Sequence, residues 1–299
     1  MSRIRVRLSL GFLLIACTTP QEPSEGTDGG ILVLDAHGGP RDGGLSLPGN
    51  PQLESQIPEQ FVHVYRIGGF YIMGTDERPL ETDRQDRTGE EAVQQAVDLF
   101  SSLLDGDDDG DVDDPVLLEN LAKHFVFAVG HESSLSPFED DFDRRTGRYV
   151  MAMKTDVWPF FPDWNGRGFS LLRIGSSLWR PPNMNALWEE CFHTVTEAYN
   201  RHRPEWSFSP EGVFGRSMQA DIEAQAYDIE EQNRLEGGHY DWSTAVNEYI
   251  HQIWLVNQGG QAAVLTAPQI GVLDVMKATP GFPMSMDKDA ERSLAVRVR

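Results

Sequence analysis

The chain has 299 residues, of which 39% are hydrophobic and 24% are charged, and its formal net charge at pH 7 is −22. This length allows one sizeable hydrophobic core or two small domains. The excess of acidic residues disfavours nucleic acid and anionic membrane surfaces as partners, because both repel a negatively charged protein.

The N-terminus has the pattern of an exported bacterial precursor. Three arginines among the first seven residues precede an apolar run that is too short to span a bilayer, so residues 1–16 are predicted to be a removed signal peptide. Leu14–Cys17 resembles the lipoprotein cleavage motif, although a cysteine can also follow an apolar leader by chance. The resemblance implies lipidation of Cys17 and an anchor in the cell envelope. The residue after Cys17 is Thr18 and not Asp, which resembles lipoproteins that are sorted to the outer membrane.

The mature chain would carry a net charge of about −25, because residues 1–16 contain three arginines and no acidic residue. It would keep only two cysteines, Cys17 and Cys191, and acylation of the first excludes an intramolecular disulfide. The lipid is then the expected contact with the membrane. Stability must come from the core and from bound ions.

Composition divides the mature chain into three parts. Residues 17–58 hold many Gly, Pro, Ser and acidic residues with little periodicity, which predicts a flexible tether behind the lipidated cysteine. Residues 59–283 carry the periodic apolar segments of a folded domain. Residues 284–299 lack such segments and are predicted to be a loosely held tail.

The first half of the folded domain combines strand and helix patterns. Two apolar runs around a Gly-Gly pair predict a β-hairpin, a helical repeat follows, and two further runs are typical of strands. The predicted segments are residues 61–67, 70–73, 89–104, 124–129 and 149–153. His131 and Glu132 lack a second histidine at the spacing of a zinc motif, which favours a loop over a metal site at this position.

An acidic segment, residues 105–116, resembles the calcium loop of an EF-hand. Aspartates occupy alternate positions, and a glycine stands where such a loop turns sharply. The predicted Ca²⁺ ligands are Asp105, Asp107, Asp109, Asp111 and Asp113. The twelfth position holds Val116 and not a bidentate glutamate, so Asp113, Asp114 or Glu119 would have to substitute. The alternatives are a structural calcium site and a solvated acidic turn.

The segment around which the domain is organised runs from Asn185 to Tyr199 and predicts a helix that begins near Ala186. Its apolar residues do not fit one narrow stripe, which indicates burial on most sides. Three glutamates and a histidine nevertheless recur three or four residues apart. Buried carboxylates are costly unless they are paired or bind a cation, so a metal site is predicted. The four residues are Glu189, Glu190, His193 and Glu197.

Each of these side chains also has a simpler interpretation. A single histidine on an apolar helix often forms only a hydrogen bond in the core, and Glu197 can face solvent or pair with Arg201. Cys191 points away from the face of Glu189 and His193 and is interpreted as a small apolar core residue rather than a nucleophile.

Three more helices are predicted in the C-terminal part, over residues 218–233, 245–256 and 268–278. The second of them is predicted to follow a Ser-Thr cap and carries Glu248 and His251, three residues apart. Two helices that each carry Glu-x-x-His are typical of a di-iron site in a four-helix bundle, which needs two further glutamates. Glu119 and Glu223 are available, but the predicted strands fit a bundle poorly.

A zincin-like site is the other interpretation, and it is preferred to the di-iron site. In zincins, one helix supplies His-Glu-x-x-His and a later helix supplies the third ligand. Glu189–His193 looks like this motif with its first histidine replaced by glutamate, and Asn247–Trp254 resembles the downstream helix of metallopeptidases similar to anthrax lethal factor. Residues 61–283 also look like a group of secreted proteins with an Asp-rich loop, a Glu-Glu-x-x-His helix and a Glu-Tyr helix. The resemblance implies an α+β, zincin-like fold with a small mixed sheet followed by a mainly helical C-terminal part.

The zincin resemblance also implies a role for each residue of the motif. The ligands of Zn²⁺ or another divalent ion would be Glu189, His193 and Glu248, with His251 as a second imidazole. Glu190 would be the general base, and Tyr240 would stabilise the oxyanion. The additional carboxylate makes the ion less Lewis-acidic and shifts the preference towards harder ions such as Mn²⁺ or Ca²⁺.

Together these observations predict a surface-anchored lipoprotein that hydrolyses a peptide or protein substrate with a metal ion. The competing class is a catalytically inactive domain that binds metal or calcium and interacts with a partner. Glu190 separates the two classes, because a general base is needed only for turnover.

Overall fold

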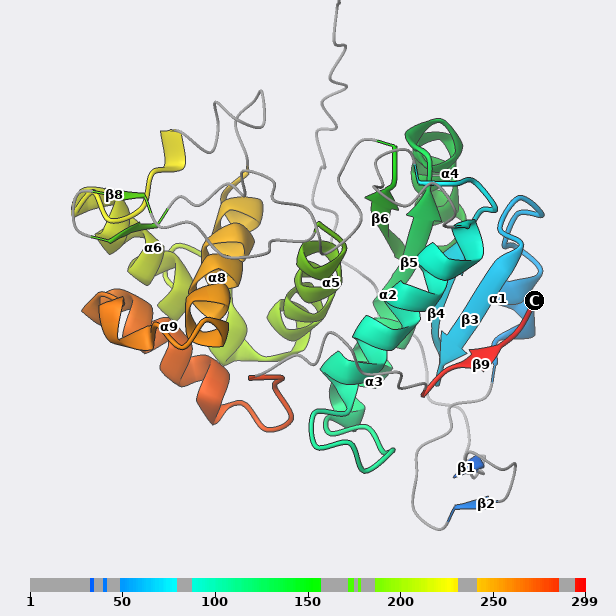
Figure 1. The fold of residues 1–299 in the computed structure, drawn as a ribbon, viewed down its shortest axis with the longest axis horizontal. Helices are drawn as coiled ribbons and strands as arrows, with labels where there is room; N and C mark the ends of the chain where they lie inside the picture. Colours follow the sequence, from blue (N-terminus) through cyan, green and yellow to red (C-terminus); the bar gives the residue numbers. More distant parts are fainter. Residues whose placement is uncertain are drawn as a thin grey trace, which may run out of the picture. The chain divides into compact units, whose positions relative to one another are not determined.

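The computed structural model describes residues 49–79, 88–156, 172–174, 177–178, 186–230, 241–284 and 294–299, together with two short paired strands, β1 (Val33–Leu34) and β2 (Pro40–Arg41). The predicted signal peptide and Cys17 lie outside this range. The described residues belong to one compact unit, Ile31–Arg299. Its first part contains a mixed sheet with helices, and its C-terminal part is mainly helical (Figure 1). The predicted α+β class is confirmed.

The main sheet has five strands in the order β6-β5-β4-β3-β9. These strands are β3 (His63–Ile67), β4 (Phe70–Gly74), β5 (Phe125–Gly130), β6 (Tyr149–Lys154) and β9 (Val296–Arg297). β3 and β4 form the predicted hairpin, and Gly68 supplies the left-handed conformation of its turn, with φ of 55°. β4, β5 and β6 run parallel, so helices connect them. A second small sheet pairs β7 (Arg173–Ile174) with β8 (Ser177–Leu178).

Helices cover both faces of the main sheet, and alternate residues of β5 therefore enter two different cores. The covering helices are α1 (Pro51–Glu54), α2 (Gly89–Leu104), α3 (Pro115–His124) and α4 (Glu132–Thr146). Phe125, Phe127 and Val129 join the larger core with α2, α3 and the C-terminal helices. Val126 and Ala128 join a smaller core with α1 and α4. Burial on both faces explains why this strand reads as one continuous apolar run.

Helix α4 begins where the sequence predicts a loop. His131 is the non-helical N-cap residue, as the loop interpretation predicts, whereas Glu132 is the first residue of the helix. Leu135, Phe138 and Phe142 form a short apolar stripe that packs into the smaller core. Most other positions of α4 are polar, which makes the helical repeat hard to recognise in the sequence.

The described residues of the C-terminal part are mainly helical. The helices are α5 (Ala186–His202), η1 (Pro204–Trp206), α6 (Val213–Glu223), α8 (Trp242–Gln258), η2 (Ala262–Val264) and α9 (Ala267–Ala278). The predicted start of α5 is confirmed, but α6 ends before Gln225, which adopts a left-handed φ of 58°. The predicted cap of α8 is also wrong, because Asp241 accepts the hydrogen bond from the Thr244 backbone N–H. None of the helices in the described ranges is long and apolar enough to span a membrane.

One buried carboxylate fixes α8 relative to its neighbours. Asp221 of α6 is 1% exposed and accepts hydrogen bonds from the Tyr249 hydroxyl of α8 at 2.7 Å and from Gln269 Nε2 of α9 at 2.6 Å. Thr266, the N-cap residue of α9, also donates to it at 3.0 Å. The Asp221 carboxylate therefore links α6, α8 and α9, because a buried carboxylate that loses a hydrogen-bond donor destabilises the fold.

The C-terminal tail differs from the loosely held segment that its composition predicts. Val296 and Arg297 pair with β3 as its outer neighbour, and the Val298 N–H donates to the Val64 carbonyl at 2.8 Å. The Leu294 N–H donates to the Ser101 hydroxyl. Local composition does not reveal this pairing, because the open edge of β3 provides the partners and not the tail itself. Residues 285–293 lie outside the described range.

Candidate metal centre

Helix α5 lies within the larger core and is buried on most sides, as its sequence predicts. Leu187, Phe192, Val195 and Ala198 are each 0% exposed. A polar side chain on such a buried helix needs a partner. Glu189 and His193 of α5 face α8, where they form the candidate metal centre together with two residues of that helix.

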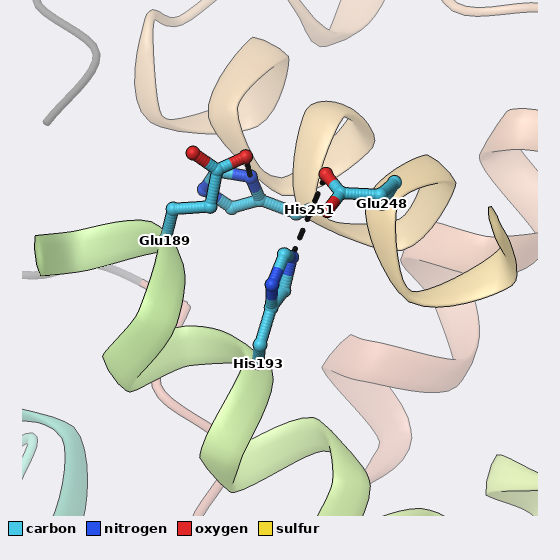
Figure 2. Close-up of side chains that lie close together, drawn as sticks. All are labelled: Glu189, His193, Glu248 and His251. Carbon is cyan, nitrogen blue, oxygen red and sulfur yellow. Dashed lines mark ion pairs between the residues drawn. The ribbon is translucent and has the colours of Figure 1, made fainter. Parts of the chain in front are cut away.

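Four side chains from α5 and α8 converge on one point (Figure 2). His193 Nε2 lies 3.7 Å from Glu248 Oε2, and His251 Nδ1 lies 3.4 Å from Glu189 Oε1. One potential ligand atom from each of the four side chains lies within 4.8 Å of the other three. The contacts pair the start of α5 with the later part of α8, so the two helices run antiparallel. These are the same four residues that the resemblance to zincins predicts as metal ligands.

The two imidazoles are buried, and three of their four ring nitrogens form no hydrogen bond within the described part of the chain. The side chain of His193 is 9% exposed and that of His251 is 1% exposed. His193 Nε2 and both ring nitrogens of His251 form no hydrogen bond with any described residue. Buried polar atoms are nearly always hydrogen-bonded or bound to an ion or water. Their ring nitrogens are therefore open to coordination, which fits a metal ion between the two helices.

The electrostatics of the site favour neutral imidazole and charged carboxylate, the protonation states that metal ligands require. Burial, with a smaller contribution from the nearby His251, lowers the pKa of His193 to about 3, and Glu189 partly opposes this effect. For Glu189, burial raises the pKa, but contact with His251 and the proximity of His193 outweigh it, so the pKa lies below its usual value. At neutral pH, the 3.7 Å contact of His193 is therefore not an ion pair.

The other acids of α5 lie outside this group of four. Glu190 is half-buried, and its charge contributes to the raised pKa of Tyr149 at the start of β6, behind larger effects of burial, Glu139 and Glu197. Glu197 accepts a hydrogen bond from Asn200 at 3.3 Å, and burial raises its pKa. An ion pair of Glu197 with Arg201, one of the simpler interpretations, is not among the described contacts, although the Arg201 charge lowers the pKa of Glu197.

The remaining predicted site residues have different positions. Tyr240 falls in residues 231–240, outside the described range. Glu119 and Glu223 are exposed and do not join the four ligand candidates, so neither supplies the extra carboxylate of a di-iron site. Cys191 is 0% exposed, and burial raises the pKa of its thiol well above the usual value, as expected for an apolar core residue.

The acidic loop forms a second, more exposed group of carboxylates. Side-chain oxygens of Asp105, Asp107 and Asp109 lie within 4.8 Å of one another. Asp105 is 2% exposed and accepts from the backbone N–H groups of Asp109 and Gly110, both at 3.1 Å. Burial raises the pKa of Asp105. This is the first half of the predicted calcium loop.

The second half of the loop does not complete the group. Asp111 and Asp113 are absent from it, and Asp113 accepts from the Gly106 backbone N–H at 2.7 Å. Asp114 is the N-cap residue of α3 and also pairs with Arg203 at 2.7 Å, so it cannot readily replace the missing twelfth ligand. Val116 belongs to α3 and is 51% exposed.

No protein-family model, no curated protein sequence and no solved structure matches this chain. The candidate metal centre and the acidic loop are therefore characterised by their geometry alone.

Two polar residues beside the candidate metal centre, Thr196 and Asn247, have no clear signal in the sequence. They link α5 to α8 through a hydrogen bond of 2.5 Å between Thr196 Oγ1 and Asn247 Oδ1. Only the position of Asn247 next to Glu248 could have drawn attention to this pair.

Proposed function

We propose that this protein binds a divalent metal ion between α5 and α8 and uses it to hydrolyse peptide bonds. The observation that carries the proposal is the convergence of Glu189, His193, Glu248 and His251, with buried ring nitrogens that form no hydrogen bond among the described residues. Two carboxylates so close together repel each other unless a cation lies between them. A divalent ion would supply that charge and would bind the imidazoles at the same time.

The donor set favours a borderline or hard ion. Imidazole and carboxylate suit Zn²⁺, Mn²⁺ and Fe²⁺, whereas a soft ion would prefer thiolate. Cys191, although it lies on the same helix, is buried elsewhere in the core and is not part of the group. We therefore propose Zn²⁺ or Mn²⁺ as the ion.

Glu190 is the proposed general base. A divalent ion at this centre would polarise the scissile carbonyl and make a nearby water easier to deprotonate. Glu190 directly follows the ligand Glu189 in the chain, which is the position of the general base in the zincin motif. It would accept the proton of the attacking water and pass it to the leaving amine. Tyr240 keeps its proposed role as the group that stabilises the oxyanion.

The arrangement of elements supports the zincin-like part of the proposal. A small mixed sheet precedes a helix with two ligands one turn apart, and a later helix carries the remaining ligands. The departure is Glu189, where zincins have a histidine. This residue makes the site more negative, which strengthens the binding of a cation and weakens its Lewis acidity.

A second candidate function is a catalytically inactive metal-binding domain. The specific observation in its favour is that four protein ligand atoms already lie within 4.8 Å of one another. A tetrahedral ion that binds all four would have no open position for substrate, as in structural zinc sites. The hydrolase therefore requires that one of the four, or an expanded coordination shell, leaves room for the reacting groups.

Location and calcium complete the proposal. We propose that Cys17 carries a lipid that anchors the protein to the bacterial outer membrane, and that the loop of Asp105, Asp107 and Asp109 binds a structural Ca²⁺. The lipobox-like Leu14–Cys17 supports the first point. The convergence of three carboxylates supports the second.

The test combines metal analysis with a peptidase assay on the purified protein. Wild type and Glu190→Gln should each contain about one equivalent of a transition metal, and His193→Ala should lose it. His131→Ala is the matched control, because His131 lies outside the group of four and should leave the metal content unchanged. Glu190→Gln should lower hydrolysis by about 100-fold or more.

The outcomes separate the two candidate functions. Metal that is lost in His193→Ala, without hydrolysis by wild type, would support the inactive metal-binding domain. Metal content that is insensitive to His193→Ala would refute the metal centre. Equal hydrolysis by wild type and Glu190→Gln would refute the assignment of Glu190 as the base.

A further inference from the structure

A buried polar contact joins the two helices that carry the proposed metal ligands. Thr196 Oγ1 of α5 donates a hydrogen bond to Asn247 Oδ1 of α8 at 2.5 Å. Thr196 is 0% exposed and Asn247 is 5% exposed. Asn247 directly precedes the ligand Glu248, and Thr196 lies one turn after the ligand His193.

The same amide also reaches the backbone beside the metal ligand. Asn247 Nδ2 donates to the backbone carbonyl of His193 at 3.4 Å. The Thr196 hydroxyl lies 3.1 Å from this carbonyl, so the three groups form one small cluster. Asn247 of α8 thus contacts both the side chain of Thr196 and the main chain of the proposed ligand His193.

Both helices also carry buried apolar residues near this cluster in the chain, and these discriminate poorly between arrangements of the helices. Phe192 and Val195 of α5 and Val246 and Ile250 of α8 are each 0% exposed. Apolar side chains tolerate small sliding movements, but a buried amide and hydroxyl must meet or lose a hydrogen bond. A single buried polar contact can thereby fix the register of two packed helices.

We infer that Thr196 and Asn247 are positioning residues that set the register of α5 and α8, so that the four ligand side chains converge before an ion binds. The inference rests on the proposed metal centre. It assigns to this pair the task of preorganisation rather than of coordination. Outer contacts that orient metal ligands are commonly worth about 10- to 100-fold in metal affinity.

The test replaces both polar groups by apolar groups of similar shape. The double variant Thr196→Val/Asn247→Leu keeps the volume of the contact and leaves no unpaired polar group, so its Tm should remain near that of wild type. Its affinity for Zn²⁺ or Mn²⁺, measured by competition with a chromophoric chelator, should fall by about 10- to 100-fold. Thr196→Ser, which keeps the hydroxyl, should bind the ion as wild type does.

A matched control separates positioning from stability. Thr279 is 5% exposed, and its hydroxyl accepts from Trp206 Nε1 at 2.8 Å, away from the four ligand candidates. Thr279→Val removes a buried hydrogen bond and should lower Tm without changing the metal affinity. Thr196→Val should lower both. If the double variant does not fold, the comparison of Thr196→Val with Thr279→Val decides the question.

Two results would count against different claims. Wild-type affinity in the double variant, or in Thr196→Val, would overturn the positioning role while the metal centre remains. If wild type itself binds neither ion with a dependence on His193, the proposed metal centre fails, and the positioning inference fails with it.

Discussion

At the scale of single residues, the candidate centre depends on a histidine that stays neutral. The pKa of His193 falls to about 3 because burial and the neighbouring His251 disfavour its charged form. The pKa of Glu189 is also below its usual value, so this carboxylate stays charged where His193 is neutral. A charged Glu189 beside a neutral His193 is suited to a cation.

The depressed pKa of His193 predicts how the stability of the metal-free protein depends on pH. The unfolded state titrates near 6.5 and the folded state near 3, so the unfolded state binds more protons between these values. Stability is therefore fully present above pH 6.5 and is lost as the pH falls towards 3. Between pH 7 and pH 5 the free energy of unfolding should fall by about 2 kcal/mol because of this residue.

Urea unfolding of chelator-treated protein at the two pH values measures this effect. His193→Gln cannot titrate and should show a correspondingly smaller loss between pH 7 and pH 5. An identical pH dependence in wild type and His193→Gln would mean that His193 is not held neutral in the folded protein.

At the scale of elements, the acidic loop is connected to the helix of the metal centre. Asp114 ends the loop, caps α3 through the backbone N–H groups of Val116 and Leu117, and pairs with Arg203 just after α5. Arg203 also lies over the ring of Tyr199, with 5.5 Å between its guanidinium carbon and the ring centroid. The conformation of the acidic loop therefore affects the contacts of Arg203, which lies directly after the C-terminal end of α5.

The geometry of the loop predicts which aspartates matter for calcium. Ca²⁺ should raise the Tm of wild type, because an ion that binds only the folded state stabilises it. Asp107→Asn should abolish most of this increase, since Asp107 belongs to the converging group. Asp111→Asn is the matched control, because Asp111 lies in the same loop but outside the group. Differential scanning calorimetry with and without Ca²⁺ tests both.

The EF-hand sequence pattern and the structure predict different results for the Asp111→Asn variant. If Asp111→Asn abolishes the calcium effect as completely as Asp107→Asn does, the complete loop binds the ion as its sequence pattern indicates. A Tm that does not respond to Ca²⁺ in wild type would identify the segment as a solvated acidic turn.

At the scale of the whole molecule, the end of the chain completes the main sheet. β9 covers the edge of β3, and Arg297 pairs with Glu90 of α2 at 2.6 Å. Val296 and Val298 remain 59% and 38% exposed, so backbone hydrogen bonds contribute more than apolar burial. The stability gained from this strand is accordingly modest.

Deletion of residues 294–299 should therefore lower the free energy of unfolding by about 1–2 kcal/mol, the range expected for a few lost hydrogen bonds. Chemical denaturation of the full and shortened chains measures the difference. Val296→Thr keeps the backbone pairing and should have little effect. Equal stability of the full and shortened chains would mean that β9 contributes nothing to the sheet.

The sequence by itself determined the local elements and the spacing of the two ligand candidates on α5, and its resemblance to zincin helices named Glu248 and His251 as the other two. The hairpin around Gly68, the start of α5 at Ala186 and the spacing of Glu189 and His193 follow from local periodicity and turn chemistry. Burial of α5 on most sides also follows, because its apolar residues do not fit one stripe. These features depend on neighbours in the chain and are therefore visible in the chain.

Only the tertiary structure decided which distant residues meet. The sequence shows Glu197 on the same helical spacing as Glu189 and His193, yet the fold brings Glu248 and His251 to the ligand group and leaves Glu197 outside it. The same holds for the pairing of β9 with β3 and for the Thr196–Asn247 contact. The physical reason is that such contacts depend on how two elements pack and in which register, and neither is encoded in the periodicity of either element alone.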